Sequence, residues 1–299
     1  PILYVIMIIL LVGVLFTTPI NGATSWYNIG PISFQPSEFA KICVILSFAL
    51  AIVKFQKKGR NEISRPTVLM RCLLVAVVPI LLIVKQPDYG TAIAFFVSLG
   101  LILITAGINK KYIIAAFVLV IIALPLLYFF VLPVHAKTRI DVFLNPNLDP
   151  RGSGYNVLQS KLAIGSGKVF GLGIKNGSQT QLGYLYPQTT DFIYSAIGEE
   201  MGFLVATGVI VLYVILIIRA LYIAKTAKDN MGSYIASGIA GIFLFHMVEN
   251  IGMTMGLLPI TGVPLPFVSY GGSSLMTNYI LIGLLLGISS RRNKVMFAK

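Results

Sequence analysis

The chain has 299 residues, of which 57% are hydrophobic and only 11% are charged, and its mean hydropathy is +0.87. A soluble domain carries roughly 25% charged residues, so this composition excludes an ordinary soluble protein. The formal net charge of +13 does not indicate nucleic-acid binding, because the basic residues gather mainly in short loops between apolar runs. The sequence therefore predicts an all-α polytopic membrane protein with no nucleic-acid partner.

Apolar runs recur that are long enough to cross a bilayer, which takes about 20 helical residues. The loop 54–71 is rich in Lys and Arg, whereas 20–35 has none, so the positive-inside rule assigns 54–71 to the cytoplasm. Since the chain opens inside an apolar run at Pro1, we interpret upstream sequence as missing. We predict one integral-membrane domain over 1–299 with eight spans, at about 1–19, 36–54, 67–85, 89–107, 112–132, 191–223, 231–256 and 271–290.

The segment 133–190 is predicted to be a long extracellular loop, and its length indicates a function. Long loops escape the positive-inside rule, so its cations need another explanation. Two explanations stay open: contact with lipid headgroups or water, and binding of an anionic ligand such as a diphosphate. The cations are Lys137, Arg139, Arg151, Lys161, Lys168 and Lys175.

Asp191 follows two threonines and is predicted to begin a long helix at the outer face of the membrane. One interpretation is a helix cap, because a carboxylate accepts hydrogen bonds from the first N–H groups of a helix. The other is a general base at the boundary of water and lipid, able to take a proton from a sugar hydroxyl. Both roles are compatible.

Further along the same predicted helix, Ser195, Gly198 and Gly202 share a face with Asp191. Such small residues favour close helix packing or leave room for a ligand. Glu199 would lie roughly 12 Å deeper than Asp191 on a straight helix. Acids at that depth normally face a cavity or a partner, so we expect Glu199 and Glu200 to organise a cavity.

Three other polar clusters are predicted to reach the same outer leaflet. The first runs from Trp26 to Lys41 and pairs Glu38 with Lys41 at a spacing of three residues. The second is the tight turn around Asp88, and the third, 264–274, opens the last span with free N–H groups and hydroxyls that suit an anion. Together the clusters predict an outward-facing cavity with carboxylates, cations and aromatic walls.

Five ordered motifs resemble the SEDS family (shape, elongation, division and sporulation). They are FQPSE at 34–38, QPDYGT at 86–91, TDFIY at 190–194, GEEMG at 198–202 and PLPFVSYGGSS at 264–274. The elongation branch is closest, on the segments NPNLDP at 145–150, YNVLQSKLAIGSG at 155–167 and GLLPITGVP at 256–264. Family members have ten spans, so the resemblance implies a SEDS-type helical bundle here whose first two helices lie outside this sequence. The chain departs from the family at 186–191, where YPQTTD replaces the usual Pro-Glu-x-His-Thr-Asp.

The resemblance implies a peptidoglycan glycosyltransferase that polymerises lipid II at the outer face of the bacterial cytoplasmic membrane during cell elongation. It implies inversion at MurNAc C1, with undecaprenyl diphosphate as leaving group and Asp191 as the catalytic base. The expected substrate-binding residues are Trp26, Glu38, Lys41, Asp88, Arg139, Lys161, Ser269, Tyr270, Gly271 and Ser273, with Gln35, Glu199 and Glu200 shaping the cavity.

The resemblance also implies a divalent cation, Mg²⁺ or Mn²⁺. Its site stays open, with Asp191 and Asp88 as the candidate ligands. The implied partners are a class B penicillin-binding protein, which supplies transpeptidation, and other membrane proteins of the elongation complex. Three alternatives stay open: a division or sporulation polymerase of the same family, a lipid II flippase, and a scaffold for the penicillin-binding protein.

Overall fold

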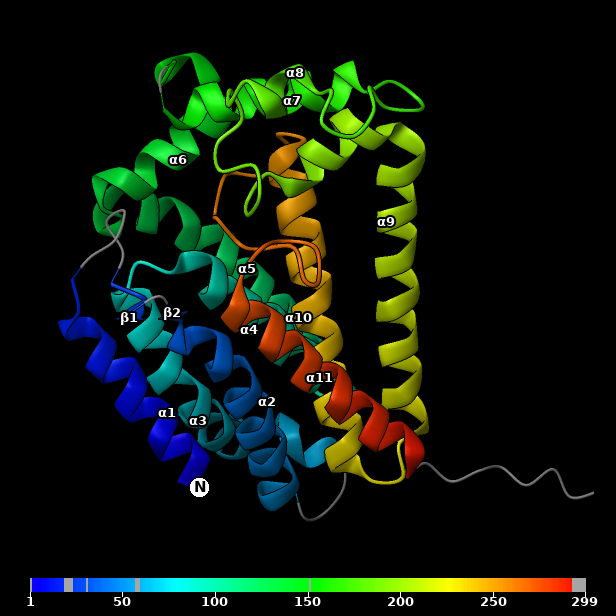
Figure 1. Cartoon of the computed structure of the whole chain (residues 1–299). Coiled ribbons are helices and arrows are strands. Elements are labelled where there is room, and N and C mark those ends of the chain that lie inside the picture. Colours follow the sequence, from blue (N-terminus) through cyan, green and yellow to red (C-terminus); the bar gives the residue numbers. More distant parts are fainter. Residues whose placement is uncertain (1, 19–23, 31, 57–59, 151, 292–299) are drawn as a thin grey trace, which may run out of the picture. The chain divides into compact units, whose positions relative to one another are not determined.

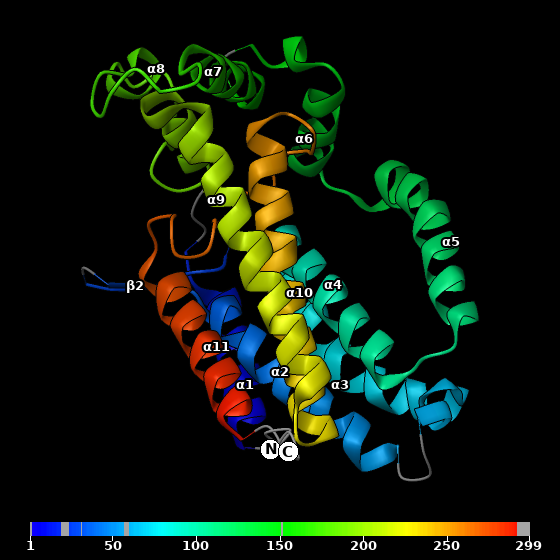
Figure 2. The ribbon, with the colours of Figure 1, turned by 90° about the vertical axis from the view of Figure 1, so that its right-hand side faces the viewer.

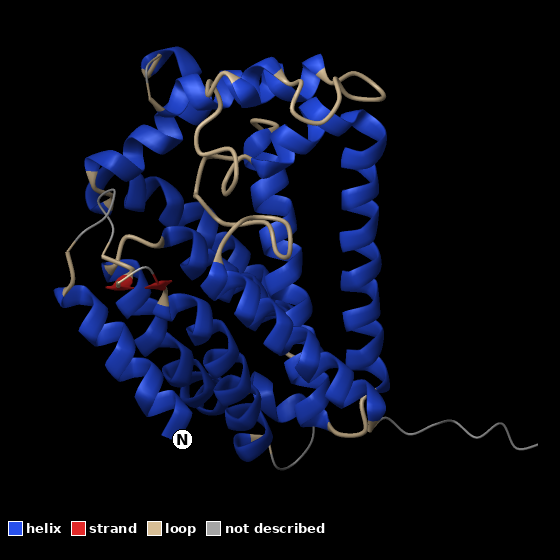
Figure 3. Ribbon diagram, viewed as in Figure 1, coloured by secondary structure: helices blue, strands red, loops and turns tan. Residues whose placement is uncertain are grey.

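The computed structural model describes residues 2–18, 24–30, 32–56, 60–150 and 152–291. In that part the chain is almost entirely helical, with a single pair of short strands (Figure 3). The chain divides into two compact units. Unit 1 comprises 1–110, 215–245 and 272–299, and unit 2 comprises 111–214 and 246–271. Each unit is described by itself, and the single domain over 1–299 stays a prediction.

Each predicted span coincides with a helix to within a few residues (Figure 1). The helices are α1 (Ile2–Gly13), α2 (Pro36–Phe55), α3 (Pro66–Lys85), α4 (Tyr89–Ala106), α5 (Lys110–Leu126), α6 (Val134–Leu144), α7 (Ser153–Ser166), α8 (Ser178–Gln181), α9 (Ile193–Thr226), α10 (Asn230–Thr254) and α11 (Gly272–Ser290). Short helical turns lie at Val14–Phe16, Arg60–Ser64, Leu127–Val131 and Pro146–Leu148, and the strands are β1 (Tyr27–Ile29) and β2 (Ile32–Phe34). The chain is a multi-pass membrane protein, since six described helices are long and apolar enough to cross a membrane. The count of eight stays a prediction.

In unit 1, α2 packs against α1, α3, α4 and α11 (Figures 1 and 2). Pro36 opens α2, where a missing N–H costs nothing, and Val44, Phe48 and Ile52 are fully buried along it. Gly241 of α10 lies so close to the backbone of α4 that a side chain there would meet the Cα atom of Ser98. Small residues of this kind let membrane helices approach one another without a driving force from water.

In unit 2, α9 is interrupted at Gly202, whose φ of 75° and ψ of −177° are not helical. Glycine adopts this conformation without the steric cost that a Cβ atom would add. A break of this kind frees backbone N–H and C=O groups, which need partners because a buried backbone group without one is costly.

The segment 168–173 supplies those partners. The amides of Leu172 and Gly173 donate to the carbonyl oxygens of Glu199 and Glu200, each at 3.0 Å. On the other side of the break, the amides of Phe203 and Leu204 donate to the carbonyls of Lys168 and Val169, at 2.9 and 3.2 Å. The segment 168–173 is therefore docked into the break by four backbone hydrogen bonds.

These findings correct two predictions. The predicted uninterrupted helix 191–223 is wrong, because α9 begins at Ile193 and is broken at Gly202; the depth of roughly 12 Å expected for Glu199 on a straight helix therefore does not apply. The segment 133–190 contains helices of its own, α6, α7 and α8, and its extracellular position stays a prediction. These helices are shorter than the run of about 20 apolar residues that marks a membrane span, so a search for spans does not predict them.

The break gives a direct test. Gly202→Ala should destabilise unit 2, because alanine disfavours this φ and its Cβ atom would overlap the backbone of Gly171. We expect a cost of about 1–3 kcal/mol, seen as a lower melting temperature and faster proteolysis within 166–190. Gly208→Ala is the matched control, since a Cβ atom at Gly208 of the same helix meets nothing within 4 Å. Equal stability of the two variants would contradict the docking.

Candidate functional site

In unit 1, the starts of three helices bring predicted site residues together. Asp88 caps α4 by accepting from the amide of Thr91 at 3.1 Å, and its second oxygen accepts from Ser37 at 3.0 Å and from the Gln35 side chain at 3.3 Å. The backbone N–H of Gln35 donates to the Ser273 hydroxyl at 3.2 Å. Asp88, Gln35 and Ser273 therefore form one hydrogen-bonded cluster.

Glu38 and Lys41 form the predicted ion pair one turn into α2. The Lys41 Nζ and Glu38 Oε1 atoms are 2.8 Å apart, and the side chains are only 1% and 2% exposed. The other oxygen, Glu38 Oε2, is buried without a hydrogen bond from any described residue. A buried pair of this kind is costly to form, so it indicates a functional constraint more than a contribution to stability.

Trp26 is partly exposed, whereas both of its neighbours are anchored in unit 1. The Ser25 hydroxyl donates to the Gln86 carbonyl at 3.1 Å, and the Tyr27 hydroxyl donates to the Leu10 carbonyl at 3.0 Å. The indole is thus held by a fixed backbone while part of its surface stays open to a ligand or to lipid.

In unit 2, Asp191 lies in the turn two residues before α9 begins at Ile193. Burial raises the pKa of the Asp191 carboxyl above its ordinary value, while a hydrogen bond from Thr190 and the positive charge of Arg139 lower it in part. The Gly262 backbone lies beside the carboxylate, since a Cβ atom there would be 3.4 Å from Asp191 Oδ2. A carboxylate with a raised pKa and a nearby cation suits a general base.

Residues of the motif 264–274 form hydrogen bonds to the backbone just before Asp191. The Ser269 hydroxyl donates to the Thr190 carbonyl at 2.7 Å and accepts from the Leu265 amide at 2.8 Å. The Tyr270 amide donates to the Thr189 carbonyl at 2.9 Å, while its side chain is 81% exposed. Gly271, which follows, is partly exposed. Ser269 therefore anchors the backbone, and Tyr270 presents its side chain outward.

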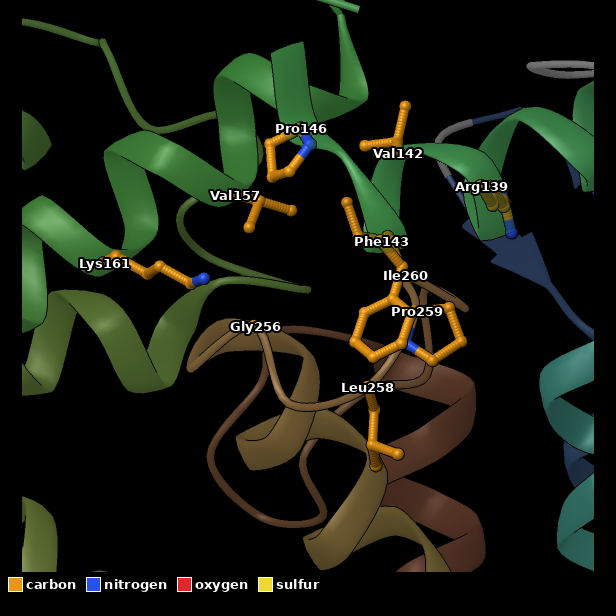
Figure 4. A pocket seen from close by; sticks show the side chains of 10 residues that line it. All are labelled: Arg139, Val142, Phe143, Pro146, Val157, Lys161, Gly256, Leu258, Pro259 and Ile260. Carbon is orange, nitrogen blue, oxygen red and sulfur yellow. The ribbon is translucent and has the colours of Figure 1, made fainter. Parts of the chain in front are cut away.

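Two loop cations line a small cavity in unit 2, between α6, α7 and 256–260 (Figure 4). Lys161 points toward Gly256, whereas Arg139 lies on the opposite side of the lining, where its guanidinium donates to the Thr261 carbonyl at 3.4 Å. The cavity volume is about 10 Å³, which is the space of about one water molecule. A diphosphate does not fit into this volume. Arg139 and Lys161 would therefore bind an anion only at the rim of the cavity, or after residues 256–260 move.

The other loop cations do not join this cavity among the described residues. Lys137 donates to the Phe129 carbonyl at 3.2 Å, and Lys168 and Lys175 are exposed. Arg151 lies outside the described residues.

Glu199 is fully buried and holds the start of α8. Its two carboxylate oxygens accept from the backbone amides of Gln179 at 2.8 Å and Thr180 at 2.9 Å, while Glu200 accepts from the Gln181 side chain at 3.1 Å. Negative charge is favourable at a helix N-terminus, where these amides have no partner within the helix. Both acids thus bind residues 179–181 instead of projecting into open space.

The small face of α9 packs against α7. Gly198 lies against Ile164, and Gly167 lies against the backbone of Gly198 so closely that a side chain at Gly167 would overlap it. The hydroxyls of Ser160 and Ser195 are 2.6 Å apart, and Ser160 also donates to the Thr254 carbonyl at 2.6 Å. Close helix packing therefore accounts for these small residues, without room left for a ligand.

Sequence analysis did not identify a row of polar side chains on α10 that contacts Asp191 and the segment 261–264. His246, Glu249 and Asn250 share one helix face, at spacings of three and four residues. The Glu249 carboxylate accepts from the Thr261 hydroxyl at 2.8 Å, and His246 Nδ1 lies 2.8 Å from the Pro264 carbonyl oxygen. The available signal was the presence of ionisable and amide side chains inside an apolar span, which is itself a mark of function.

The described residues contain no cluster of three His, Cys, Asp or Glu side chains that could hold a metal ion. Mg²⁺ is commonly held by one or two carboxylates together with substrate phosphates and water, so a single carboxylate is compatible with it. The Asp88 carboxylate accepts three hydrogen bonds and the Asp191 carboxylate one, from Thr190, so Asp191 is the better fit of the two candidate ligands.

Both units therefore carry part of the predicted site. The unit 1 residues are Trp26, Gln35, Glu38, Lys41, Asp88 and Ser273, and the unit 2 residues are Arg139, Lys161, Asp191, Glu199, Glu200, Ser269, Tyr270 and Gly271. That the two sets line one outward-facing cavity stays a prediction.

Comparison with known proteins adds independent findings. A family model described as "Cell cycle protein", which covers FtsW, RodA and SpoVE, matches residues 1–294. The chain is 39% identical to the "Peptidoglycan glycosyltransferase MrdB" of Escherichia coli, across 98% of this chain and 78% of that relative. It is 37% identical to the "Probable peptidoglycan glycosyltransferase FtsW" of Trichlorobacter lovleyi, across 97% and 75%.

Two solved structures have the same fold. One is described as "Structural coordination of polymerization and crosslinking by a peptidoglycan synthase complex"; it is 28% identical, with a TM-score of 0.80 over 98% of this chain and 81% of that chain. The other is the rod shape determining protein RodA of Thermus thermophilus, also 28% identical, with a TM-score of 0.68 over 98% and 78%.

Proposed function

This chain belongs to the FtsW, RodA and SpoVE family of cell cycle proteins, and on that premise we propose that it is a peptidoglycan glycosyltransferase of the elongation type. It polymerises lipid II at the outer face of the bacterial cytoplasmic membrane. The observation that carries the proposal is Asp191, a partly buried carboxylate with a raised pKa, fixed by its backbone beside a cation.

In the proposed reaction, the acceptor's GlcNAc 4-hydroxyl attacks C1 of the donor's MurNAc. The new C–O bond forms as the bond from C1 to the diphosphate oxygen breaks, and undecaprenyl diphosphate leaves with the electron pair. Asp191 takes the proton of the attacking hydroxyl. Because a single displacement converts an α-linked donor into a β-linked glycan, the anomeric centre inverts and one base suffices.

The leaving diphosphate carries negative charge that needs stabilisation. Arg139 and Lys161 supply positive charge in unit 2, and Lys41 does so in unit 1. A divalent cation held by Asp191 with the substrate diphosphate would supply more. We include it in the proposal as a bound Mg²⁺ or Mn²⁺, with a class B penicillin-binding protein as the partner that cross-links the product.

Two alternatives remain specific enough to test. A division or sporulation polymerase of the FtsW or SpoVE type would perform the same chemistry with a different partner. A lipid II flippase would move the substrate without polymerising it. The chemistry of Asp191 favours the polymerase, because a raised carboxylate pKa beside a cation serves proton transfer.

The decisive experiment is polymerisation of labelled lipid II by the purified full chain in liposomes, with Mn²⁺ and a class B penicillin-binding protein of the elongation type. We expect glycan strands, less product without the partner, and little after chelation of the cation. Transbilayer movement of lipid II without any polymer would support the flippase. Polymer formed only with a division-type partner would assign the chain to division.

The raised pKa of Asp191 predicts the pH dependence of the reaction. The ionised base is lost as the pH falls through this pKa, so the acid limb of kcat/KM should lie above the ordinary carboxyl value of 3.8. Arg139→Gln should move the limb to still higher pH, since the cation that lowers the pKa is gone. Lys175→Gln, which removes an exposed cation of the same extracellular segment, is the control. An acid limb unchanged by Arg139→Gln would contradict the assignment.

A further inference from the structure

Asn250 of α10 is fully buried and bonds two separate segments of unit 2. Its Nδ2 atom lies 3.0 Å from the Asp191 carbonyl oxygen and 2.9 Å from the Val263 carbonyl oxygen. Carbonyl oxygens only accept hydrogen bonds, so the amide nitrogen must face them. One side-chain NH₂ group thus ties the backbone of the proposed base to the backbone beside Gly262.

This arrangement is costly, which indicates a specific purpose. The Asn250 Oδ1 atom is buried without a hydrogen bond from any described residue. A buried polar atom that lacks a partner costs about 1–3 kcal/mol, so an apolar side chain here would remove that penalty. The amide is favourable only through the two bonds that its nitrogen donates.

Those two bonds fix the surroundings of the Asp191 carboxylate. The Gly262 backbone lies beside Asp191 Oδ2, and Arg139 bonds the carbonyl of the adjacent Thr261. Holding Asp191 to Val263 therefore sets the position of the carboxylate relative to both the peptide at Gly262 and the charge of Arg139.

We propose that Asn250 is a positioning residue for the transfer reaction, which holds the Asp191 carboxylate in its reactive place through the paired bonds to Asp191 and Val263. The proposal rests on Asp191 being the base. Asn250 touches no substrate; it acts through the backbone of Asp191. Its loss should impair the chemical step and leave substrate binding intact.

The test compares Asn250→Leu, which keeps the size and removes both donors, with Asn250→Gln, which keeps the NH₂ group on a longer side chain. For Leu we expect a fall in kcat of about 10²-fold, as for a misplacement of about 1 Å, with KM nearly unchanged. The acid limb of the pH profile should also move, because the surroundings of Asp191 change. Gln should recover part of the lost kcat.

Asn278→Leu is the matched control, since Asn278 is another buried asparagine, in α11 of unit 1. It should keep the parent's pH profile. If Asn250→Leu does not fold, Asn250→Ala replaces it, because alanine also lacks both donors and is small enough to fit the site. A folded Asn250 variant without these donors that keeps the parent's kcat and acid limb would overturn the proposal. If that occurs while Asp191→Asn is inactive, the positioning role alone fails; an active Asp191→Asn instead removes the proposed function.

Discussion

The docking of residues 168–173 into the break of α9 is the constraint on which the rest of unit 2 depends. A helix that is broken inside an apolar run leaves backbone groups without partners, and here the segment 168–173 satisfies them. Once 168–173 is fixed, α7 lies on the small face of α9, and the bond between Ser160 and Ser195 joins the two helices. The part of α9 before Gly202, which directly follows Asp191 in the chain, is thereby held in place.

The arrangement around Asp191 is built mainly from backbone contacts. Ser269 and Asn250 bind the carbonyl oxygens of residues 190 and 191, so they hold the backbone at Asp191 without engaging its carboxylate. Preorganisation of this kind matters in catalysis, because a base that is already in place spends no energy on reorganisation in the transition state. Unit 1 follows a related plan, in which the starts of α2, α4 and α11 bring Gln35, Asp88 and Ser273 together.

Much of the fold could be predicted from the sequence, because membrane spans are encoded in local hydropathy. The positions of the helices and the family motifs around Asp191 came from that local signal. The break at Gly202 did not, since a glycine on a small helix face has the same local pattern whether the helix continues or stops. What decides between the two is a segment about 30 residues away in sequence, and the roles of Glu199 and Asn250 likewise depend on distant backbone groups.

The measurement that tests the central claim most directly is the rate of lipid II polymerisation by Asp191→Asn, made beside the parent in the same liposomes and with the same partner. Asparagine matches the size of aspartate but cannot take up the proton, so the account predicts a loss of about 10²–10⁴-fold with an unchanged melting temperature. Folding should not suffer, because asparagine also accepts hydrogen bonds from the first N–H groups of a helix. A folded Asp191→Asn variant that polymerises lipid II at the parent's rate would contradict the account.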